Sequence, residues 1–407
     1  MSKAIDRKKL DILIIGTGMY VCGRGTDGYG TILPAVYEWK KSGFAGGVHI
    51  AGTQPDGIRI VKKKVAELNK LFGFAVDVKY YPEQEMRDPE VYKKAIDDIP
   101  RPACAIVVVP DHLHRTVAGY AVENGLHTLV VKPLAPTIKE TLELVELQER
   151  RNVYCAVEFH KRFDRSNLRL KDAISSGKIG EPLYFIVEYS QRKSIPTERF
   201  KKWVETINIF QYLGIHYVDI IYFATRAVPK RVMAIGQKNY LLSKGIDTYD
   251  SIQAFIEWEM PSGIRFNSSF FTNWIDPENT SAMSDQRIKV IGTKGRYEAD
   301  QKNRGIRIVT DANGIEEPNP DFCSMYGTAV GDISFRGYGI ESVLQFLDDV
   351  CGIESGTLNI AGLEGRRPTF KDSIVTTAII EAVNKSLAEN GKWINVKSNH
   401  GKSITLE

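Results

Sequence analysis

The sequence has no long apolar run and no concentrated block of positive charge. No stretch approaches the roughly 18 apolar residues of a membrane-spanning helix, so we expect no membrane span. The basic residues 1–10 lead only into the short run Ile12–Ile15, which is too short for a signal peptide. Lys and Arg number 54 against 50 Asp and Glu, a formal charge of +4, which argues against a nucleic-acid partner.

Cysteine is scarce and shows no pairing pattern. The five cysteines are odd in number and lie far apart, at Cys22, Cys104, Cys155, Cys323 and Cys351. They form neither the CxxC spacing of a metal site nor a disulfide framework. We therefore expect reduced thiols in a cytoplasmic protein and no bound metal.

Glycine, by contrast, is crowded at one place. Six glycines fall within fifteen residues: Gly16, Gly18, Gly23, Gly25, Gly28 and Gly30. They follow the apolar strand expected at 11–15, and a helix is expected to begin near Thr31. Such a turn lets backbone N–H groups approach a pyrophosphate. Gly16 and Gly18 match the first two positions of GxGxxG, but the third is Val21, so this is an imperfect fingerprint with an enlarged loop. A flexible turn without a ligand is the alternative.

Strands and helices alternate through residues 1–157, and fully apolar strands such as 105–109 indicate a parallel sheet covered on both faces. Residues 158–407 instead carry successive strand-like runs without crossover helices. We predict an α/β fold: a doubly wound dinucleotide-binding domain at 1–157, then an α+β substrate-binding and oligomerisation domain at 158–407 with a largely antiparallel open sheet. The C-terminal helices could pack back on the first domain.

The end of the second strand leaves the cofactor open. A carboxylate there binds the ribose of NAD and a basic residue suits NADP, but the segment 51–54 has neither. Thr53 could donate a hydrogen bond to a ribose or phosphate, and Arg59 could reach in from the next helix. NAD or NADP is expected, with NAD slightly favoured.

Polar residues follow the fourth and fifth strands, whose carboxyl ends border the ligand crevice in doubly wound sheets. Pro110 and His114 follow the fourth strand, and Lys132 and Pro133 follow the fifth. The prolines fix the local backbone, and Lys132 would place a cation in the crevice. A solvated lysine and a helix-start histidine are the alternatives.

A second polar group lies on the helix expected at 208–224. At 100° per residue, Asn208, Tyr212, His216 and Asp219 fall within an arc of roughly 80°. The next arc is apolar. The polar row could line a pocket, or it could be an exposed face with His216 merely solvated.

Together these motifs resemble the Gfo/Idh/MocA family of glucose-fructose oxidoreductases and inositol dehydrogenases. The resemblance rests on the segments VVVPDHLHRTVAGYAVENGLHTLVVKPLAPT, VEFHKRF, SGKIGEP, GIHYVD, GTKG and GKWIN, in that order along nearly the whole chain. It implies an N-terminal Rossmann domain and a C-terminal domain whose open sheet mediates homodimers or homotetramers. It also implies hydride transfer on sugars, inositols or related polyols.

The chain departs from the family pattern at two positions. The glutamate of the family's EKP motif is Val131 here, although Lys132 remains. The aspartate of the family's D-x-G-x-H helix is replaced by Tyr212.

The resemblance, combined with the chemistry of the side chains, gives a candidate site. His216 is the first choice for general acid and base, Lys132 would stabilise an alkoxide, and Tyr212 could share the proton. Substrate contacts are expected from Lys132, His160, Arg162, Asn208, Tyr212 and His216. Cofactor contacts are expected from Gly16, Thr17, Gly18, Met19, Tyr20, Thr53, Pro110, His114 and Lys132. Trp203, Asn273 and Trp274 are weaker candidates.

We therefore predict an NAD(P)-dependent oxidoreductase acting on a hydroxyl-bearing carbon of a small carbohydrate or polyol. One alternative is an NAD-dependent glycoside hydrolase that works by transient oxidation and elimination, for which Tyr212 would supply an extra proton-transfer group. Another alternative is a non-catalytic family member. It is favoured by Val131, by the missing ribose carboxylate and by the irregular glycine loop.

Overall fold

The computed structural model describes residues 9–44, 46–84, 86–200, 203–327, 331–398 and 404–407. Within these ranges no helix is both long and apolar enough to cross a membrane. The chain forms two compact units. Unit 1 holds residues 1–135, 139–163 and 321–373, and unit 2 holds residues 136–138, 164–320 and 374–407.

Unit 1 is built on a six-stranded parallel sheet in the order β3-β2-β1-β4-β5-β6. Its strands are β1 (Asp11–Ile15), β2 (Val48–Ala51), β3 (Val78–Tyr81), β4 (Ala103–Val107), β5 (His127–Val131) and β6 (Cys155–Glu158). The central strands are fully buried, as expected for parallel strands with both faces covered. The doubly wound sheet predicted from the sequence is confirmed.

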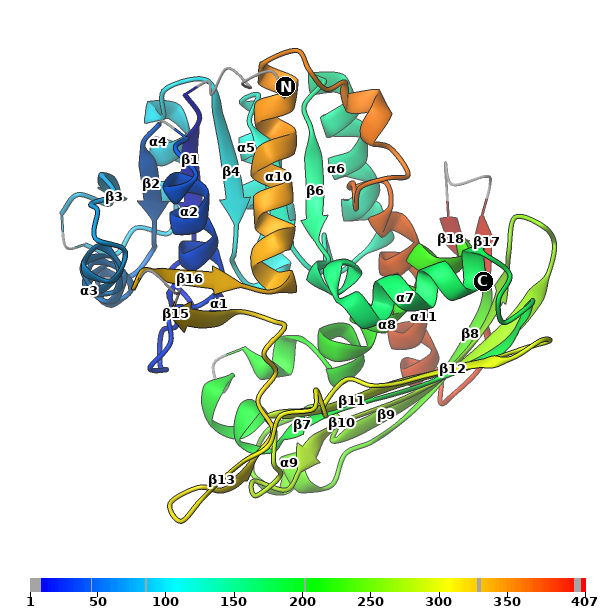
Figure 1. The fold of residues 1–407 in the computed structure, drawn as a ribbon. Coiled ribbons are helices and arrows are strands. Elements are labelled where there is room, and N and C mark those ends of the chain that lie inside the picture. Colours follow the sequence, from blue (N-terminus) through cyan, green and yellow to red (C-terminus); the bar gives the residue numbers. More distant parts are fainter. Residues whose placement is uncertain (1–8, 45, 85, 201–202, 328–330, 399–403) are drawn as a thin grey trace. The chain divides into compact units, whose positions relative to one another are not determined.

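Helices cover both faces of this sheet, with α2 and α10 in front and α4, α5 and α6 behind in Figure 1. The helices of unit 1 are α1 (Met19–Cys22), α2 (Ile32–Lys41), α3 (Pro55–Phe72), α4 (Val91–Asp98), η1 (Asp111–Leu113), α5 (His114–Glu123), α6 (Ile138–Arg151), η2 (His160–Phe163), α10 (Tyr338–Glu354) and η6 (Ile360–Leu363). A two-stranded ribbon, β15 (Ser324–Gly327) and β16 (Ile333–Arg336), precedes α10.

Helix α10 belongs to unit 1 although it lies far along the chain. Val343, Leu347 and Val350 are fully buried in the same apolar cluster as Ile14 and Trp39. The predicted division at 157/158 therefore differs from the observed units, because residues 158–163 and 321–373 fold with the Rossmann sheet. A hydrophobic face needs a partner wherever that partner lies in the sequence.

Unit 2 is built on a mixed, mostly antiparallel sheet of eight strands in the order β12-β11-β7-β10-β9-β8-β17-β18, in which β7 and β10 are parallel. Its strands are β7 (Pro182–Arg192), β8 (Val228–Gln237), β9 (Ser251–Glu259), β10 (Arg265–Asp276), β11 (Ser284–Gly292), β12 (Arg296–Asp300), β17 (Ile394–Ser398) and β18 (Ile404–Leu406). Its helices are α7 (Arg165–Ser175), η3 (Ile195–Arg199), η4 (Val204–Thr206), η5 (Phe210–Gly214), α8 (Ile215–Thr225), α9 (Tyr240–Ser243) and α11 (Ser373–Ala388). The second predicted sheet is thus confirmed as well.

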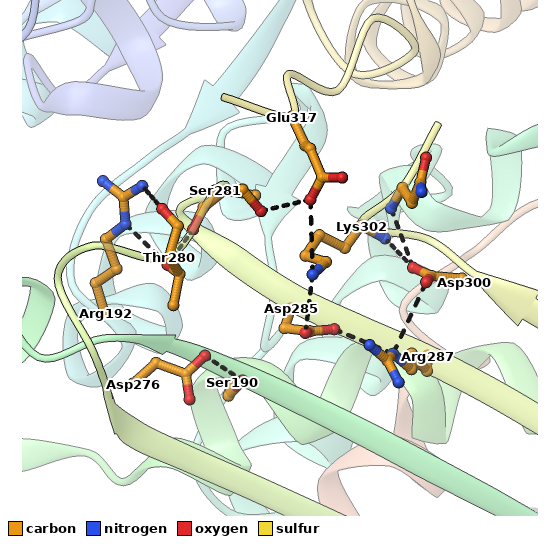
Figure 2. A network of polar contacts seen from close by, with 12 residues as sticks. Ser190, Arg192, Asp276, Thr280, Ser281, Asp285, Arg287, Asp300, Lys302 and Glu317 are labelled. Carbon is orange, nitrogen blue, oxygen red and sulfur yellow. Dashed lines mark hydrogen bonds and ion pairs between the residues drawn. The ribbon is translucent and has the colours of Figure 1, made fainter. Parts of the chain in front are cut away.

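A polar network anchors the segment that leaves β12 for the exposed hairpin β13 (Ile308–Thr310) and β14 (Gly314–Glu316). Figure 2 shows Glu317 beside Ser281 and Lys302, and Lys302 also contacts Asp285 of β11 at 3.5 Å. Glu317 is 6% exposed, and its charge is matched by the half-buried Lys302 at 3.6 Å and by the exposed Arg307 at 3.0 Å. These contacts fix the base of a hairpin that has little core of its own.

Candidate functional site

The glycine turn between β1 and α1 has the geometry that close backbone approach requires. Gly16 adopts φ +130°, and a Cβ there would lie 2.1 Å from the carbonyl oxygen of Val108. A Cβ on Gly18 would meet nothing within 4 Å, so space lies open beside the backbone at the start of α1. The turn at the carboxyl end of β1 therefore fits a pyrophosphate group.

The enlarged glycine loop separates two helices, the single turn α1 and the longer α2, and runs from Gly23 to Thr31. Contrary to expectation, a helix does begin directly after Gly18, as the short α1, and α2 resumes at Ile32. Gly23 (φ +71°) closes the loop, since a Cβ there would lie 2.1 Å from the oxygen of Gly28. Lys64 donates to the Gly28 carbonyl at 2.8 Å. Gly23 thus serves the fold of the loop itself.

The side chain of Thr17 lies against Gly52, after β2, and Gly57 of α3. Thr17 is 9% exposed, and its side chain packs where Cβ atoms on Gly52 and Gly57 would stand. Thr53 is exposed at the end of β2, and Arg59 forms an ion pair with Asp56.

His114 joins the ends of β4 and β5. Its ring is fully buried, with Nδ1 2.6 Å from the Pro133 carbonyl oxygen and Nε2 2.8 Å from that of Val109. Both ring nitrogens are thus engaged with main chain, and the ring fixes the turn that carries Lys132. Pro110 is exposed at the same edge.

Lys132 is a half-buried cation at the carboxyl edge of the sheet. Burial lowers the pKa of its ammonium group to about 8, while the carboxylates of Asp111 and Glu158 act in the opposite direction. Desolvation dominates, because removing an ammonium group from water disfavours its charged form. A lysine whose pKa lies near neutrality in a ligand-binding crevice is a candidate for chemistry.

Glu158, which the sequence analysis did not select, lies at the end of β6 and is 2% exposed. Its Oε2 is 3.0 Å from Nδ1 of His160, and its Oε1 accepts a hydrogen bond from Ser342 at 2.6 Å. The Tyr20 hydroxyl lies 3.3 Å from the same His160 nitrogen. The signal was present in VEFHKRF, where a carboxylate stands at the carboxyl end of a buried strand.

Two neighbours of His160 are more deeply buried. Arg162 is 4% exposed and its Nη1 lies 3.0 Å from Asp372. Lys161 is 2% exposed, with its Nζ 6.0 Å from the ring centre of Tyr338. The ion pair of Arg162 holds η2 against the segment before α11, which fits a structural role better than the expected substrate contact.

In unit 2 the predicted uniform helix at 208–224 is interrupted. Residues Phe210–Gly214 form a π-helical turn, followed by α8. Because this turn holds an extra residue, the single polar row drawn at 100° per residue does not carry through it. His216 is 5% and Asp219 1% exposed, so the alternative of a solvated polar face is wrong.

The predicted residues before α8 lie in different surroundings. Asn208 donates to Asn384 at 2.7 Å and accepts from the backbone N–H of Gln211 at 2.9 Å, so its amide holds the start of the turn. Tyr212 is half-buried, and its ring centre lies 5.0 Å from Phe200 and 5.9 Å from Trp274.

The remaining candidates of unit 2 differ in their burial. Trp203 is half-buried with its ring centre 6.2 Å from Tyr212, and Trp274 is fully buried. The ring of His216 lies 6.3 Å from Tyr189. Asn273 accepts from the N–H of Ile275. In the described ranges no group of three or more His, Cys, Asp or Glu could hold a metal ion.

Two family models match this chain. The model described as "Oxidoreductase family, NAD-binding Rossmann fold" matches residues 59–159, and that described as "GFO/IDH/MocA C-terminal domain" matches residues 167–298. The chain belongs to this family of oxidoreductases, in which the N-terminal domain is described as an NAD-binding Rossmann fold.

Curated relatives are distant. Scyllo-inositol 2-dehydrogenase (NAD(+)) of Bacillus subtilis is 27% identical over 55% of this chain, a match that spans 63% of that protein, slightly less than two thirds. Levoglucosan dehydrogenase of Pseudarthrobacter phenanthrenivorans is 27% identical over 83% of this chain and 90% of its own.

A solved structure of scyllo-inositol dehydrogenase from Lactobacillus casei, with bound NAD(H) and scyllo-inositol, has a TM-score of 0.68 at 17% identity and covers 95% of this chain and 99% of its own. The myo-inositol 2-dehydrogenase of Lactobacillus plantarum has a TM-score of 0.67 at 19% identity and covers 96% of this chain and 100% of its own. At these identities the likeness shows the fold.

Proposed function

We propose that the protein is an NAD(P)-dependent dehydrogenase that acts on a CH–OH group of a sugar, inositol or sugar derivative, with NAD slightly favoured. The observation that carries the proposal is Lys132, a half-buried ammonium group with a pKa lowered to about 8 at the carboxyl edge of an NAD-binding Rossmann sheet. The relatives named as inositol and levoglucosan dehydrogenases support the substrate class.

The cofactor would be held by the turn Gly16–Tyr20 and by Pro110, and when bound it supplies a hydride acceptor. Lys132 binds the substrate oxygen and stabilises the negative charge that develops on it. His216 removes the hydroxyl proton, for which it must come within about 3 Å of that oxygen. Tyr212 shares or relays this proton, and His160 contacts the substrate.

The test is reduction of NAD⁺ or NADP⁺ followed at 340 nm with myo-inositol, scyllo-inositol and levoglucosan as substrates. We expect turnover with at least one of them, and at least a hundredfold loss on substitution of Lys132→Ala or His216→Ala, the size of one general acid–base or electrostatic contribution. Lys94→Ala, an exposed lysine of α4, is the matched control and should change nothing. Near-normal rates in both site variants would overturn the assignment.

The glycoside hydrolase alternative retains one supporting observation, the half-buried phenol of Tyr212 where the family pattern has aspartate. It predicts release of free sugar from an aryl glycoside without net cofactor reduction. A non-catalytic protein would show neither activity. If native mass spectrometry detected no binding of a nicotinamide dinucleotide, that result would support this alternative.

We also propose that the chain forms a homo-oligomer through the outer face of the unit 2 sheet. Phe271, Gln253 and Ile235 are cross-strand neighbours on β10, β9 and β8, and Phe255 points to the same face. Ile235 is 52%, Phe255 41% and Phe271 43% exposed. Large apolar side chains grouped on one sheet face are typical of an interaction surface.

A further inference from the structure

The register of the unit 1 sheet places a carboxylate beside the segment that carries Lys132. Val131 and Glu158 are partners on the parallel neighbours β5 and β6. Register partners point to the same face of a sheet, and neighbouring strands lie about 4.8 Å apart. A side chain at 158 therefore lies one strand away from, and on the same face as, a side chain at 131.

Contacts within unit 1 hold this carboxylate in one orientation. One oxygen of Glu158 accepts from Ser342 at 2.6 Å and the other lies 3.0 Å from Nδ1 of His160. The His160 ring stacks on Tyr338, with ring centres 5.7 Å apart at 17°. A carboxylate that is 2% exposed is costly unless it is hydrogen-bonded and matched by positive charge. Ser342 and His160 supply the hydrogen-bonding groups, and Lys132 is a nearby cation.

The Glu158 carboxylate affects the pKa values of two predicted contact residues, Lys132 and Tyr20. The carboxylates that act on Lys132 are Asp111 of η1 and Glu158 of β6, and both oppose the lowering of its pKa by burial. Tyr20 of α1 has a pKa raised well above its ordinary value, first by burial and next by the Glu158 carboxylate. One buried carboxylate thus acts on Lys132, directly after β5, and on Tyr20 of α1.

We propose that Glu158 is the positioning residue of the candidate site: from β6 its carboxylate orients His160, and on the sheet face of position 131 it supplies the negative charge that the family motif carries at the position of Val131. The inference rests on the proposed function only in assigning substrate contact to Lys132 and His160.

The direct test is the titration of Lys132, measured by NMR on protein whose lysines carry ¹³C-methyl groups and assigned by the signal that Lys132→Arg removes. We expect Glu158→Gln to shift this titration to lower pH by at least about half a unit, because an opposite charge nearby is lost. Glu354→Gln is the matched control. Glu354 also pairs with a buried histidine, His127, at 3.0 Å. Because His127 begins β5 and Lys132 follows its other end, no shift is expected in this variant.

Two further variants separate charge from architecture. Val131→Glu in the Glu158→Gln background should return the titration towards its original pH, because position 131 faces the same side. Glu158→Asp keeps the charge and should titrate near the unchanged protein, while a shorter side chain weakens the contact with His160 and raises the KM. Absence of any shift in Glu158→Gln, or absence of rescue by Val131→Glu, would overturn the inference.

The measurement is independent of activity, which separates the two proposals. If Lys132→Ala and His216→Ala both retain near-normal activity while Glu158→Gln shifts the titration, the proposed function fails and the positioning role of Glu158 stands. If Lys132→Ala is inactive and the Glu158→Gln titration is unchanged, only the positioning role fails. Should Glu158→Gln not fold, the Glu158→Gln/Val131→Glu pair takes its place: a Lys132 titration near that of the unchanged protein supports the inference, and a titration shifted to lower pH overturns it.

Discussion

At the scale of single residues, the charge on Lys132 decides what this edge of the sheet can do. The pKa of this ammonium group is about 8. At a lower pH the side chain is a cation that can stabilise an alkoxide, and at a higher pH it loses that ability. Burial sets this value, since it penalises the charged form of a lysine.

This gives a pH dependence of defined sign. We expect kcat/KM for polyol oxidation to fall as the pH rises through about 8, because Lys132 loses its proton there. Lys132→Arg keeps a cation at all accessible pH values, so its lower activity should show no fall near pH 8. The measurement is initial rate at 340 nm from pH 6 to about 10. A fall at the same pH in Lys132→Arg would assign it to another group.

Other residue roles needed the structure. Lys132 could be selected from the sequence because it follows a buried strand, but nothing in the sequence showed that both nitrogens of His114 face main-chain carbonyls or that Arg162 pairs with Asp372. Asp372 lies about two hundred residues from Arg162 in the sequence, so only folding brings the two side chains together. Glu158 was missed although it stands at the carboxyl end of a buried strand, because its register with Val131 shows only in the folded sheet.

At the scale of elements, the glycine turn offers two matched substitutions with different expected outcomes. Gly16→Ala places a Cβ 2.1 Å from a backbone oxygen at φ +130°, so we expect a loss of stability of about 2 kcal/mol or more. Gly18→Ala meets no protein atom within 4 Å, so its melting temperature should stay unchanged while NAD⁺ affinity falls at least about tenfold. Thermal melts and calorimetric titration check both, and unchanged affinity in Gly18→Ala would contradict pyrophosphate binding at this turn.

The same elements show what periodicity can and cannot predict. The alternation of apolar strands and helices predicted the parallel sheet because burial on both faces leaves a strong compositional signal. The start of α1 was missed because one helical turn carries too few residues to show a period. The π-helical turn at Phe210–Gly214 was missed because an extra residue leaves the apolar pattern nearly intact while rotating the residues of α8 about the helix axis.

At the scale of the whole molecule, the two units show that neighbours in the sequence need not share a core, so domain boundaries predicted from sequence order alone differ from the observed units. Val343 and Leu347 of α10 complete the core around Ile14, although unit 2 intervenes in the sequence. The sequence suggested that the C-terminal helices could pack back on the first domain, but not which side chains of that domain α10 contacts. The family resemblance carried the order of motifs and the fold class; the packing partner came from the structure.

Two exposed apolar surfaces of unit 2 compete as the place where copies would associate. The outer sheet face carries Ile235, Phe255 and Phe271, and the hairpin β13–β14 carries Val309 at 68% exposure. A stable interface buries roughly 800 Å² per partner, which a broad sheet face supplies more readily than two strands of three residues.

We therefore expect an oligomer in solution that Phe255→Glu converts to a smaller species, because a carboxylate on the sheet face must be desolvated in the interface. Val309→Glu is the matched control, since it puts the same charge on another exposed apolar position, away from that face. Sedimentation velocity of the wild type and both variants decides between them. Dissociation by Val309→Glu alone would move the interface to the hairpin, and a monomeric wild type would exclude association through either surface.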